Sequence, residues 1–217
     1  MAESNHEGLL SLRSVDLAAH LLGARVSSHI DGQLVIVRVT EVEAYDGSSD
    51  PGSHAYRGRT ARNSGLFGAP GTAYVYFTYG MHFCLNVVCG AEGAASAVLL
   101  RAGEVISGRE AVLERRRHPR TAESKLLSGP ARLAQGLGLT LANNLSTFRE
   151  GTAQPPGPSL GLEGLAEDPL DHQRGPRTGV SGRGGSDEFP WRFWLPGEPS
   201  VSTYRKAALR KPRVRTD

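Results

Sequence analysis

Hydrophobic and polar residues alternate along Gln33–Tyr45, and this period of two predicts a β-strand. One face of that strand carries three valines and then Glu41, Glu43 and Tyr45. Carboxylates avoid buried positions unless they are paired or serve a function. The pattern therefore predicts a strand that runs from the core towards a cleft and carries two carboxylates with it.

A second alternating region predicts a β-hairpin. Thr72–Thr78 and His82–Val88 are rich in aromatic and β-branched residues, the composition that strands favour. Tyr79, Gly80 and Met81 lie between them and form the expected turn, because Gly80 supplies the necessary backbone freedom. A large apolar tip is unusual on a monomeric protein, so this hairpin is expected to insert into a partner.

The rest of the pattern predicts a mixture of helices and strands. The expected elements are a helix at Ser14–Leu22, a hairpin of Arg25–Ile30 and Leu34–Tyr45 around an Asp31-Gly32 turn, a strand at Ala94–Arg101, a helix at Ser107–Arg117, a helix from Pro130 and a strand at Phe189–Leu195. The length favours one domain over residues 1–217. Residues 1–10 and 206–217 are expected to be flexible, and the Gly- and Pro-rich stretch 151–185 to be a long irregular loop.

Composition narrows the class of protein. The chain is 39% hydrophobic and 22% charged, which is ordinary for a soluble globular protein. It has no apolar run of membrane-spanning length and no evident secretory signal, so a cytoplasmic protein with no membrane contact is expected. Cys84 and Cys89 have opposite parity on or just after one strand, which favours buried free thiols over a disulfide or a shared metal.

The basic residues indicate a candidate partner. The net charge is only +3, yet just three of the 25 basic residues are lysines (Lys125, Lys206 and Lys211). Arginine is the better bidentate ligand for phosphate. Basic residues gather at Arg57–Arg62, Arg115–Arg120 and Lys206–Arg215. Each run alone is typical of a solvated surface, but three runs together make nucleic acid a candidate partner.

Glu43 is the first candidate for chemistry. A carboxylate at the end of a core strand, beside an aromatic residue, can act as a general base. It can equally form a structural ion pair with a nearby arginine, and the pattern alone favours that second interpretation. Glu41 and Glu43 could also be the acid–base pair of a glycoside hydrolase, because positions i and i+2 of a strand lie about 7 Å apart.

Aromatic residues interleaved with arginines form the second candidate site. Tyr45, Tyr74, Tyr76 and Tyr79 lie with His54 in the same segment. Each ring alone is typical of core packing, but such a set can also hold an extruded base by stacking. Asn86 on the returning strand could satisfy the backbone or contact a base edge.

The motifs of this segment resemble the alkyladenine (3-methyladenine) DNA glycosylase family. The resemblance rests on Glu43-Ala44-Tyr45, His54, RTARNSGLFGAPGTAYVYFTYGMHFCLN, VLLR at Val98–Arg101, SGPARLAQGLGL at Ser128–Leu139 and PRTGV at Pro176–Val180. It extends from about Leu17 to Trp194, and the stretch around Pro155–His172 is the diverged part. His82 and Thr178 also depart from the family, which often carries an aromatic and an aliphatic residue there.

The resemblance implies a fold and a role for each site residue. The fold is a single α/β (α+β) domain in which helices surround an antiparallel, partly barrel-like sheet and a DNA-inserting hairpin protrudes. By this resemblance Glu43 is the general base, and Arg101 and the main chain near Thr178 hold the attacking water. Tyr45, His54 and Tyr76 sandwich the flipped nucleobase, the backbone N–H of His54 reads its edge, and Asn86 crowds the guanine amino group. Tyr79 with Met81 fills the gap left in the duplex.

The resemblance also implies a function. The protein is expected to be a monomer that flips alkylated or otherwise damaged purines out of double-stranded DNA and hydrolyses the N-glycosidic bond, leaving an abasic site, in the cytoplasm at the bacterial nucleoid. No metal and no organic cofactor is required for this reaction. The Glu41–Asn86 segment holds no lysine that could form a Schiff base, which indicates a water-only mechanism. The alternatives are a non-catalytic binder of damaged DNA or of RNA, and a hydrolase of free glycosides.

Overall fold

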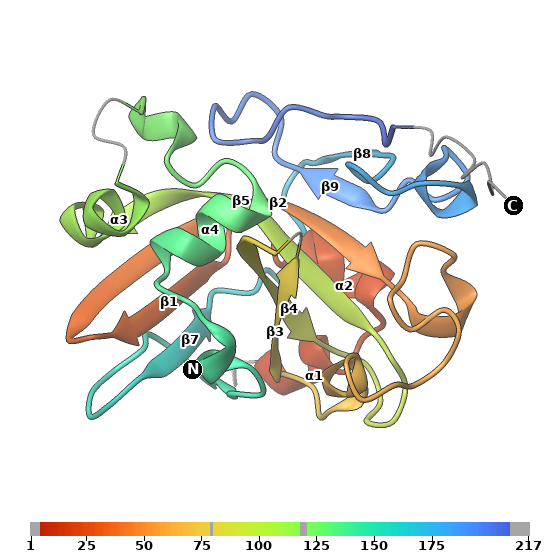
Figure 1. Cartoon of the computed structure of the whole chain (residues 1–217), viewed down its shortest axis with the longest axis horizontal. Coiled ribbons are helices and arrows are strands. Elements are labelled where there is room, and N and C mark those ends of the chain that lie inside the picture. The colour runs from red at the N-terminus through yellow and green to blue at the C-terminus, as the bar shows by residue number, and fades with distance from the viewer. Residues whose placement is uncertain (1–4, 79, 118–120, 209–217) are drawn as a thin grey trace, which may run out of the picture.

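Strand β2 (Gln33–Tyr45) lies at the centre of the structure, a computed structural model that describes residues 5–78, 80–117 and 121–208. Within those residues nine strands form one sheet in the order β3-β4-β5-β2-β1-β7-β6, and β9 pairs with both β2 and β8 (Figure 1). The pairs are antiparallel except for β6 and β7. The other strands are β1 (Arg25–Ile30), β3 (Ala73–Thr78), β4 (His82–Val88), β5 (Ala97–Ser107), β6 (Phe148–Glu150), β7 (Ser159–Glu163), β8 (Gln173–Gly175) and β9 (Arg192–Trp194).

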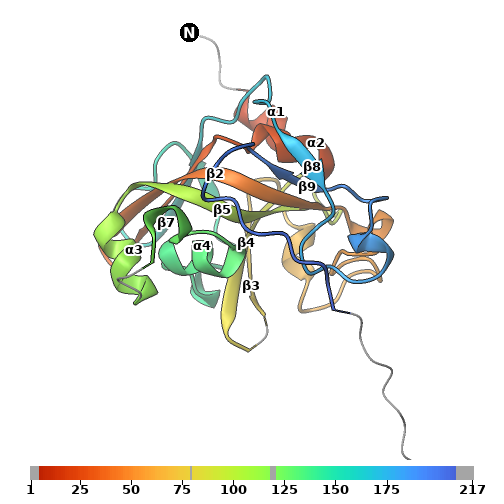
Figure 2. The same cartoon turned by 90° about the horizontal axis from the view of Figure 1, so that it is seen from above.

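Two pairs of helices cover the sheet. Figure 2 shows α1 and α2 on one side of β2 and β5, and α3 and α4 on the other. The helices are α1 (His6–Leu10), α2 (Ser14–His20), α3 (Arg109–Arg116) and α4 (Pro130–Gly136). Valines of β2 and leucines of α2 and α4 are fully buried between these layers. The curled sheet with its helices confirms the predicted α+β class.

The β1–β2 hairpin forms where the turn signal predicts it. Asp31 and Gly32 both have positive φ angles, 54° and 72°, so the two-residue turn has the backbone twist that joins antiparallel strands well. Ile30 then pairs with Gln33, and the register places Arg25 opposite Arg38. Glycine and aspartate tolerate these dihedral angles, which is why the local sequence alone sets this register.

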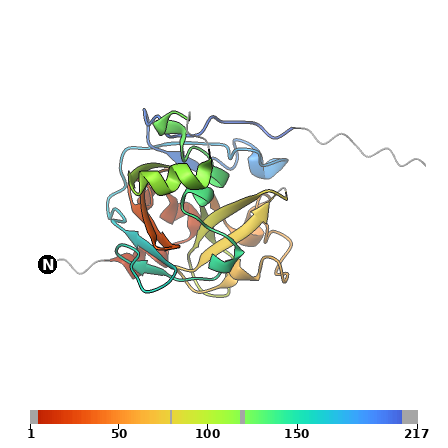
Figure 3. The same ribbon diagram turned by 60° about the vertical axis from the view of Figure 1, so that its left-hand side comes forward.

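The β3–β4 hairpin protrudes from the body of the molecule (Figure 2, Figure 3). Its strands pair from Ala73 and Val87 to Thr78 and His82, as the aromatic and β-branched composition predicts. Gly80 has a φ of 67°, a turn conformation that glycine adopts without strain. Tyr79, the predicted wedge, lies outside the described residues.

Strand β5 is longer than the sequence predicts. We expected a strand at Ala94–Arg101 and a helix from Ser107, but β5 covers Ala97–Ser107 and α3 begins at Arg109. The last four residues of β5, Glu104–Ser107, lie at or beyond the edge of the core and mix polar with apolar side chains, so the buried apolar run ends before the strand does. Arg101 therefore lies in the middle of a strand rather than at its end.

Two segments expected to be irregular are structured. The stretch 151–185 contains β7 and β8, and Leu160 and Leu162 of β7 are buried against β1. Near the N-terminus, residues 6–10 form α1 and bury Leu9 and Leu10. These elements are only three to five residues long, too short to show a clear period in the sequence.

Candidate active site

A pocket of about 490 Å³ opens beside the C-terminal end of β2. Its walls come from β2, β3, β4 and β5 and from the loops that follow Asp50 and Arg177. All seven residues predicted to act on a base or to bind it line this pocket: Glu43, Tyr45, His54, Tyr76, Asn86, Arg101 and Thr178. The structure thus brings together residues that are up to 135 positions apart in the chain.

Glu43 lies on β2 at the inner end of the pocket and is fully buried. Its Oε2 accepts a hydrogen bond from the Tyr45 hydroxyl at 2.8 Å, and its Oε1 accepts one from the backbone N–H of Thr178 at 2.6 Å. Nη1 of Arg101 lies 3.3 Å from the same Oε1. The donors expected to hold an attacking water thus contact the carboxylate itself and fix its orientation.

Glu41 is equally buried but is surrounded differently. Its Oε1 accepts hydrogen bonds from Nε of Arg101 at 3.0 Å and Nε of Arg192 at 2.6 Å. Ser202 supplies two more donors, its backbone N–H to Oε2 at 2.8 Å and its hydroxyl to Oε1 at 3.0 Å. Glu41 is therefore enclosed by protein donors and does not line the pocket, so it does not form an acid–base pair with Glu43.

Arg101 joins the two carboxylates. It is buried on β5, directly beside β2, and contacts Glu41 and Glu43 through different nitrogens. Burial lowers the pKa of Arg101, but the negative charges of Glu43 and Glu41 outweigh burial and raise it overall. Arg101 therefore stays charged, and with Arg192 it balances the two buried carboxylates.

The aromatic side chains form the walls of the pocket. The ring of Tyr76 meets His54 edge-on, with 4.9 Å between centroids, and lies nearly parallel to the ring of Tyr74 at 5.5 Å. Burial raises the pKa of Tyr45, and the charge of Glu43 raises it further. Burial also raises the pKa of Tyr76, with a smaller contribution from Cys84. Both phenols thus keep their protons and offer neutral rings to the pocket.

His54 and Asn86 complete the polar part of the pocket wall. Partial burial and the nearby charge of Arg62 lower the pKa of His54, so its ring is neutral at pH 7. The His54 carbonyl accepts a hydrogen bond from the side chain of Asn63 at 3.0 Å, which holds the loop in place. Asn86 is buried on β4, and its amide donates to the Tyr74 carbonyl at 3.0 Å. The Asn86 side chain is therefore held in one orientation.

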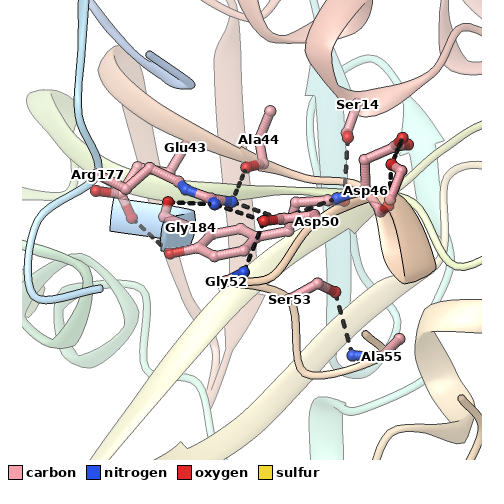
Figure 4. Close-up of polar contacts among 12 residues, drawn as sticks. Ser14, Glu43, Ala44, Asp46, Asp50, Gly52, Ser53, Ala55, Arg177 and Gly184 are labelled. Carbon is pink, nitrogen blue, oxygen red and sulfur yellow. Dashed lines mark hydrogen bonds and ion pairs between the residues drawn. The ribbon is translucent and has the colours of Figure 1, made fainter. Parts of the chain in front are cut away.

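Sequence reasoning missed a buried ion pair behind Tyr45. Arg177 is fully buried and donates to both carboxylate oxygens of Asp50 at 2.5 Å (Figure 4). It also donates to the carbonyls of Ala44 at 2.8 Å and Gly184 at 2.6 Å. Its guanidinium lies 4.5 Å from the centre of the Tyr45 ring. This pair connects β2 with the two loops of the pocket and supports one face of Tyr45.

Arg177 also helps to position a donor to Glu43. The next residue, Thr178, donates its backbone N–H to Glu43, so the pair with Asp50 also fixes that donor. Arg177 belongs to the PRTGV motif, but a single arginine in a Gly- and Pro-rich stretch gives no periodic signal. Arg192 and Ser202 were missed for the same reason, because their partner Glu41 is 151 and 161 residues away.

The tip of the β3–β4 hairpin lies outside the pocket. Met81 is 69% exposed and Phe77 is 40% exposed, which fits the predicted apolar tip. Phe83 packs against Phe77, with 5.1 Å between ring centroids. These exposed apolar side chains do not line the pocket, but Thr78 and His82 beside them do, so the tip adjoins the pocket.

The described residues contain few other features that could carry chemistry. In residues 5–78, 80–117 and 121–208, no group of three or more His, Cys, Asp and Glu side chains is placed to hold a metal ion. Cys84 and Cys89 are both buried and free, as the strand parity predicts. Burial raises the pKa of Cys84, which lines the pocket beside Tyr76. None of the helices in this part of the chain is both long enough and apolar enough to cross a membrane.

Comparison with known proteins agrees with this geometry. The family model of methylpurine-DNA glycosylase matches residues 9–199. A protein of Streptomyces avermitilis named "Putative 3-methyladenine DNA glycosylase" is 52% identical over 92% of this chain and 91% of its own length. A protein of the same name from Leifsonia xyli subsp. xyli is 46% identical over 95% of this chain and 94% of its own length.

The match extends over far more than the pocket motifs. It runs from α1 through β9 and includes Asp50, Arg177 and Arg192 as well as the predicted site. Relatives of this similarity share the whole fold rather than a local motif. The chain belongs to the methylpurine-DNA glycosylase family.

Proposed function

We propose that this DNA glycosylase flips a damaged purine out of duplex DNA into the pocket beside β2 and hydrolyses its N-glycosidic bond with a water activated by Glu43. The observation that carries the proposal is the environment of Glu43. It is a fully buried carboxylate that faces a pocket of about 490 Å³ and is oriented by three donors. A carboxylate in such a place has a fixed orientation and is shielded from bulk solvent, which favours proton transfer to it from one positioned water.

The chemistry balances with one water and no further reactant. The water oxygen forms a bond to C1′ of the deoxyribose while the bond from C1′ to the purine nitrogen breaks. The bonding electrons go to the purine, and the water proton goes to Glu43. A purine alkylated at N3 or N7 carries a positive charge, so it leaves as a neutral base. The negative charge of Glu43 also stabilises the cationic character of the sugar in the transition state.

The pocket walls supply the selectivity. Tyr45, His54 and Tyr76 would stack on the extruded base, and the backbone N–H of His54 would contact its edge. A cationic ring between aromatic faces gains cation–π attraction that a normal base lacks. Asn86 is held rigidly on β4, so it would crowd the exocyclic amino group of guanine. The cation–π attraction favours the cationic bases 3-methyladenine and 7-methylguanine, and crowding by Asn86 makes 3-methyladenine the better fit of the two, because 7-methylguanine keeps the exocyclic amino group. Hypoxanthine and ethenoadenine are neutral, so their release would also need a proton on the leaving purine.

The hairpin and the basic residues would hold the DNA. Met81 is exposed at the tip, and with Tyr79 it would fill the space left by the extruded nucleotide. Of the lysines, Lys125 donates to the carbonyls of Pro199 and Val201 and does not line the pocket. This placement favours attack by water over Schiff-base chemistry, so an intact abasic strand is the expected product of a monomeric enzyme.

The test is to replace Glu43, the proposed general base, and to measure the rate of the chemical step. Glu43→Gln keeps the size of the side chain but removes its ability to take a proton. The single-turnover rate of 7-methylguanine release should fall by about 10²–10⁴-fold. Affinity for the lesion duplex should remain, because phosphate contacts supply most of it.

Glu104→Gln is the matched control, because Glu104 is an exposed carboxylate on β5 whose partner is Arg38. That variant should release the base at the wild-type rate. If Glu43→Gln stays within about threefold of the wild type, a single acid–base residue is not at work there and the assignment fails.

A further inference from the structure

The C-terminal segment, residues 198–205, runs past β9 and along β2 and β5 (Figure 1). Glu198 pairs with Arg38 at 2.7 Å, and Lys125 donates to the carbonyl of Pro199 at 2.6 Å. The hydroxyl of Ser200 is buried and hydrogen-bonds to that of Thr40 at 2.8 Å. Most of this segment follows residue 199, where the match to the family model ends. Its contacts fix it firmly on β2 and β5.

Ser202 is the residue of this segment that reaches the buried charges. Its N–H and hydroxyl both donate to Glu41, at 2.8 Å and 3.0 Å. Its hydroxyl oxygen accepts from Arg101 at 3.2 Å, and its carbonyl accepts from Arg192 at 2.9 Å. One small residue thus contacts three charged side chains, none of which is exposed to solvent by more than 7%.

The same segment also reaches the other donor of Glu43. The carbonyl of Arg205 accepts a hydrogen bond from the backbone N–H of Gly179 at 2.9 Å. Gly179 follows Thr178, whose own N–H donates to Glu43. Both groups that contact Oε1 of Glu43, the Arg101 guanidinium and the Thr178 amide, are therefore held one step back by residues 202–205.

We propose that Ser202 is a positioning residue for the glycosylase reaction, which it serves by dividing Arg101 between Glu41 and Glu43. The inference rests on the proposed function, because it takes Glu43 as the base. Arg101 lies 3.0 Å from Glu41 and 3.3 Å from Glu43, so the two carboxylates compete for it. Ser202 satisfies Glu41 with two neutral donors and accepts from Nη2 of Arg101, which leaves Nη1 of the guanidinium for Glu43.

Without the hydroxyl, Glu41 would have one donor fewer and would attract Arg101 more strongly. A buried carboxylate that lacks a hydrogen bond draws the nearest cation more strongly, because an unpaired buried charge costs free energy. Arg101 would then turn towards Glu41 and away from Glu43, and Glu43 would lose one of the donors that fix its orientation. Displacements of about 1 Å in such an arrangement can lower a rate by about 10²-fold.

The test compares two serines of the same segment, Ser200, which is buried, and Ser202, which is half-buried. Ser202→Ala removes the hydroxyl that touches Glu41 and Arg101, whereas Ser200→Ala removes one that touches only Thr40. Each variant is measured for single-turnover release of 7-methylguanine from a duplex, for affinity to that duplex and for melting temperature. Ser202→Ala should lower the rate by about 10–100-fold while affinity changes by less than about threefold.

The conservative change and the base variant complete the design. Ser202→Thr keeps the hydroxyl and should restore the rate to within about threefold of the wild type, and Ser200→Ala should stay in the same range although it melts earlier. Equal rates for Ser202→Ala and Ser200→Ala, or an unrescued loss in Ser202→Thr, would overturn the inference. Glu43→Gln is measured in parallel, so that failure of the base assignment shows as an unchanged rate in that variant and is distinguished from failure at Ser202.

Discussion

The surroundings of Glu41 and Glu43 differ sharply, although the two residues lie two positions apart on β2 and are both fully buried. Glu41 accepts hydrogen bonds from Arg101, Arg192 and Ser202 and has no contact with the pocket. Glu43 is held by Tyr45, Arg101 and Thr178 and forms part of the pocket wall. Burial alone therefore does not mark a catalytic carboxylate. The decisive property is access to a reacting atom.

The two carboxylates also depend on each other. Removing either from water costs several kcal/mol, and only well-placed partners offset this cost. Here two carboxylates share two arginines, and Arg101 contacts both. Glu41 thus helps to set the position of the cation that also contacts Glu43, the proposed base. A site of this kind needs a supporting group that never touches the substrate.

The largest expected effect is a loss of stability when Glu41 is replaced, and it tests whether Glu41 and Glu43 differ in their structural roles. Glu41→Gln places amide hydrogens against the donors of Arg101, Arg192 and Ser202, and it leaves buried positive charge uncompensated. The free energy of unfolding should fall by about 3–5 kcal/mol. Glu43→Gln should lose clearly less, because Oε1 of the amide can still accept from Thr178 and the amide group can donate to the Tyr45 hydroxyl. Urea denaturation of both variants measures the difference, and equal losses would show that the two surroundings are energetically alike.

A smaller effect is expected on the affinity for damaged DNA when an aromatic side chain of the pocket is replaced. Tyr76→Leu removes an aromatic ring from the pocket wall that also contacts His54 and Tyr74. Affinity for a duplex with 7-methylguanine should weaken by about 1–3 kcal/mol relative to an undamaged duplex, the size of one lost base stack. The control is Phe77→Leu, the next residue on β3 and partly exposed, which should change the affinities for the two duplexes alike. Competition binding with both duplexes decides between specific and general loss.

The smallest effect concerns pH. Partial burial and the charge of Arg62 lower the pKa of His54 below its ordinary value of about 6.5. The ring is neutral above that range and becomes positively charged as the pH falls through its pKa, so it should then repel a cationic base. Binding of 7-methylguanine duplex relative to hypoxanthine duplex should weaken by about fivefold as the pH falls through the lowered pKa of His54, because two nearby unit charges repel by about 1 kcal/mol in solvent-like surroundings. The pH dependence of that ratio should vanish in His54→Gln; its persistence would assign it to another group.

Local features of the fold could be predicted from the sequence because their cause is local. The Asp31-Gly32 turn sets the β1–β2 register, and Gly80 with its aromatic flanks sets the β3–β4 hairpin. Alternation along β2 correctly placed Glu41 and Glu43 on one side, where both contact Arg101. These signals depend on residues that are neighbours in the chain, and distant parts of the fold do not change them.

The supporting groups could not be predicted, because their partners are far away in the sequence. Asp50 and Arg177 are 127 residues apart, and neither belongs to a periodic pattern. The short strand β9 carries Arg192 to Glu41 but is only three residues long. Motif resemblance gave Glu43, Arg101, Thr178 and the pocket walls a role, yet the groups that hold Arg101 and Thr178 in place are seen only in the structure.

The distance between Glu41 and its partners has a consequence for how the enzyme is made. During synthesis β2 leaves the ribosome early, but Arg192 and Ser202 follow 151 and 161 residues after Glu41. At a synthesis rate of about 5–20 residues per second, these two residues are added about 10–30 s after Glu41. Contacts of such long sequence separation form late and slowly. The hydrogen-bonded arrangement around Glu41 therefore cannot form until Arg192 and Ser202 have been synthesised and have docked onto the sheet.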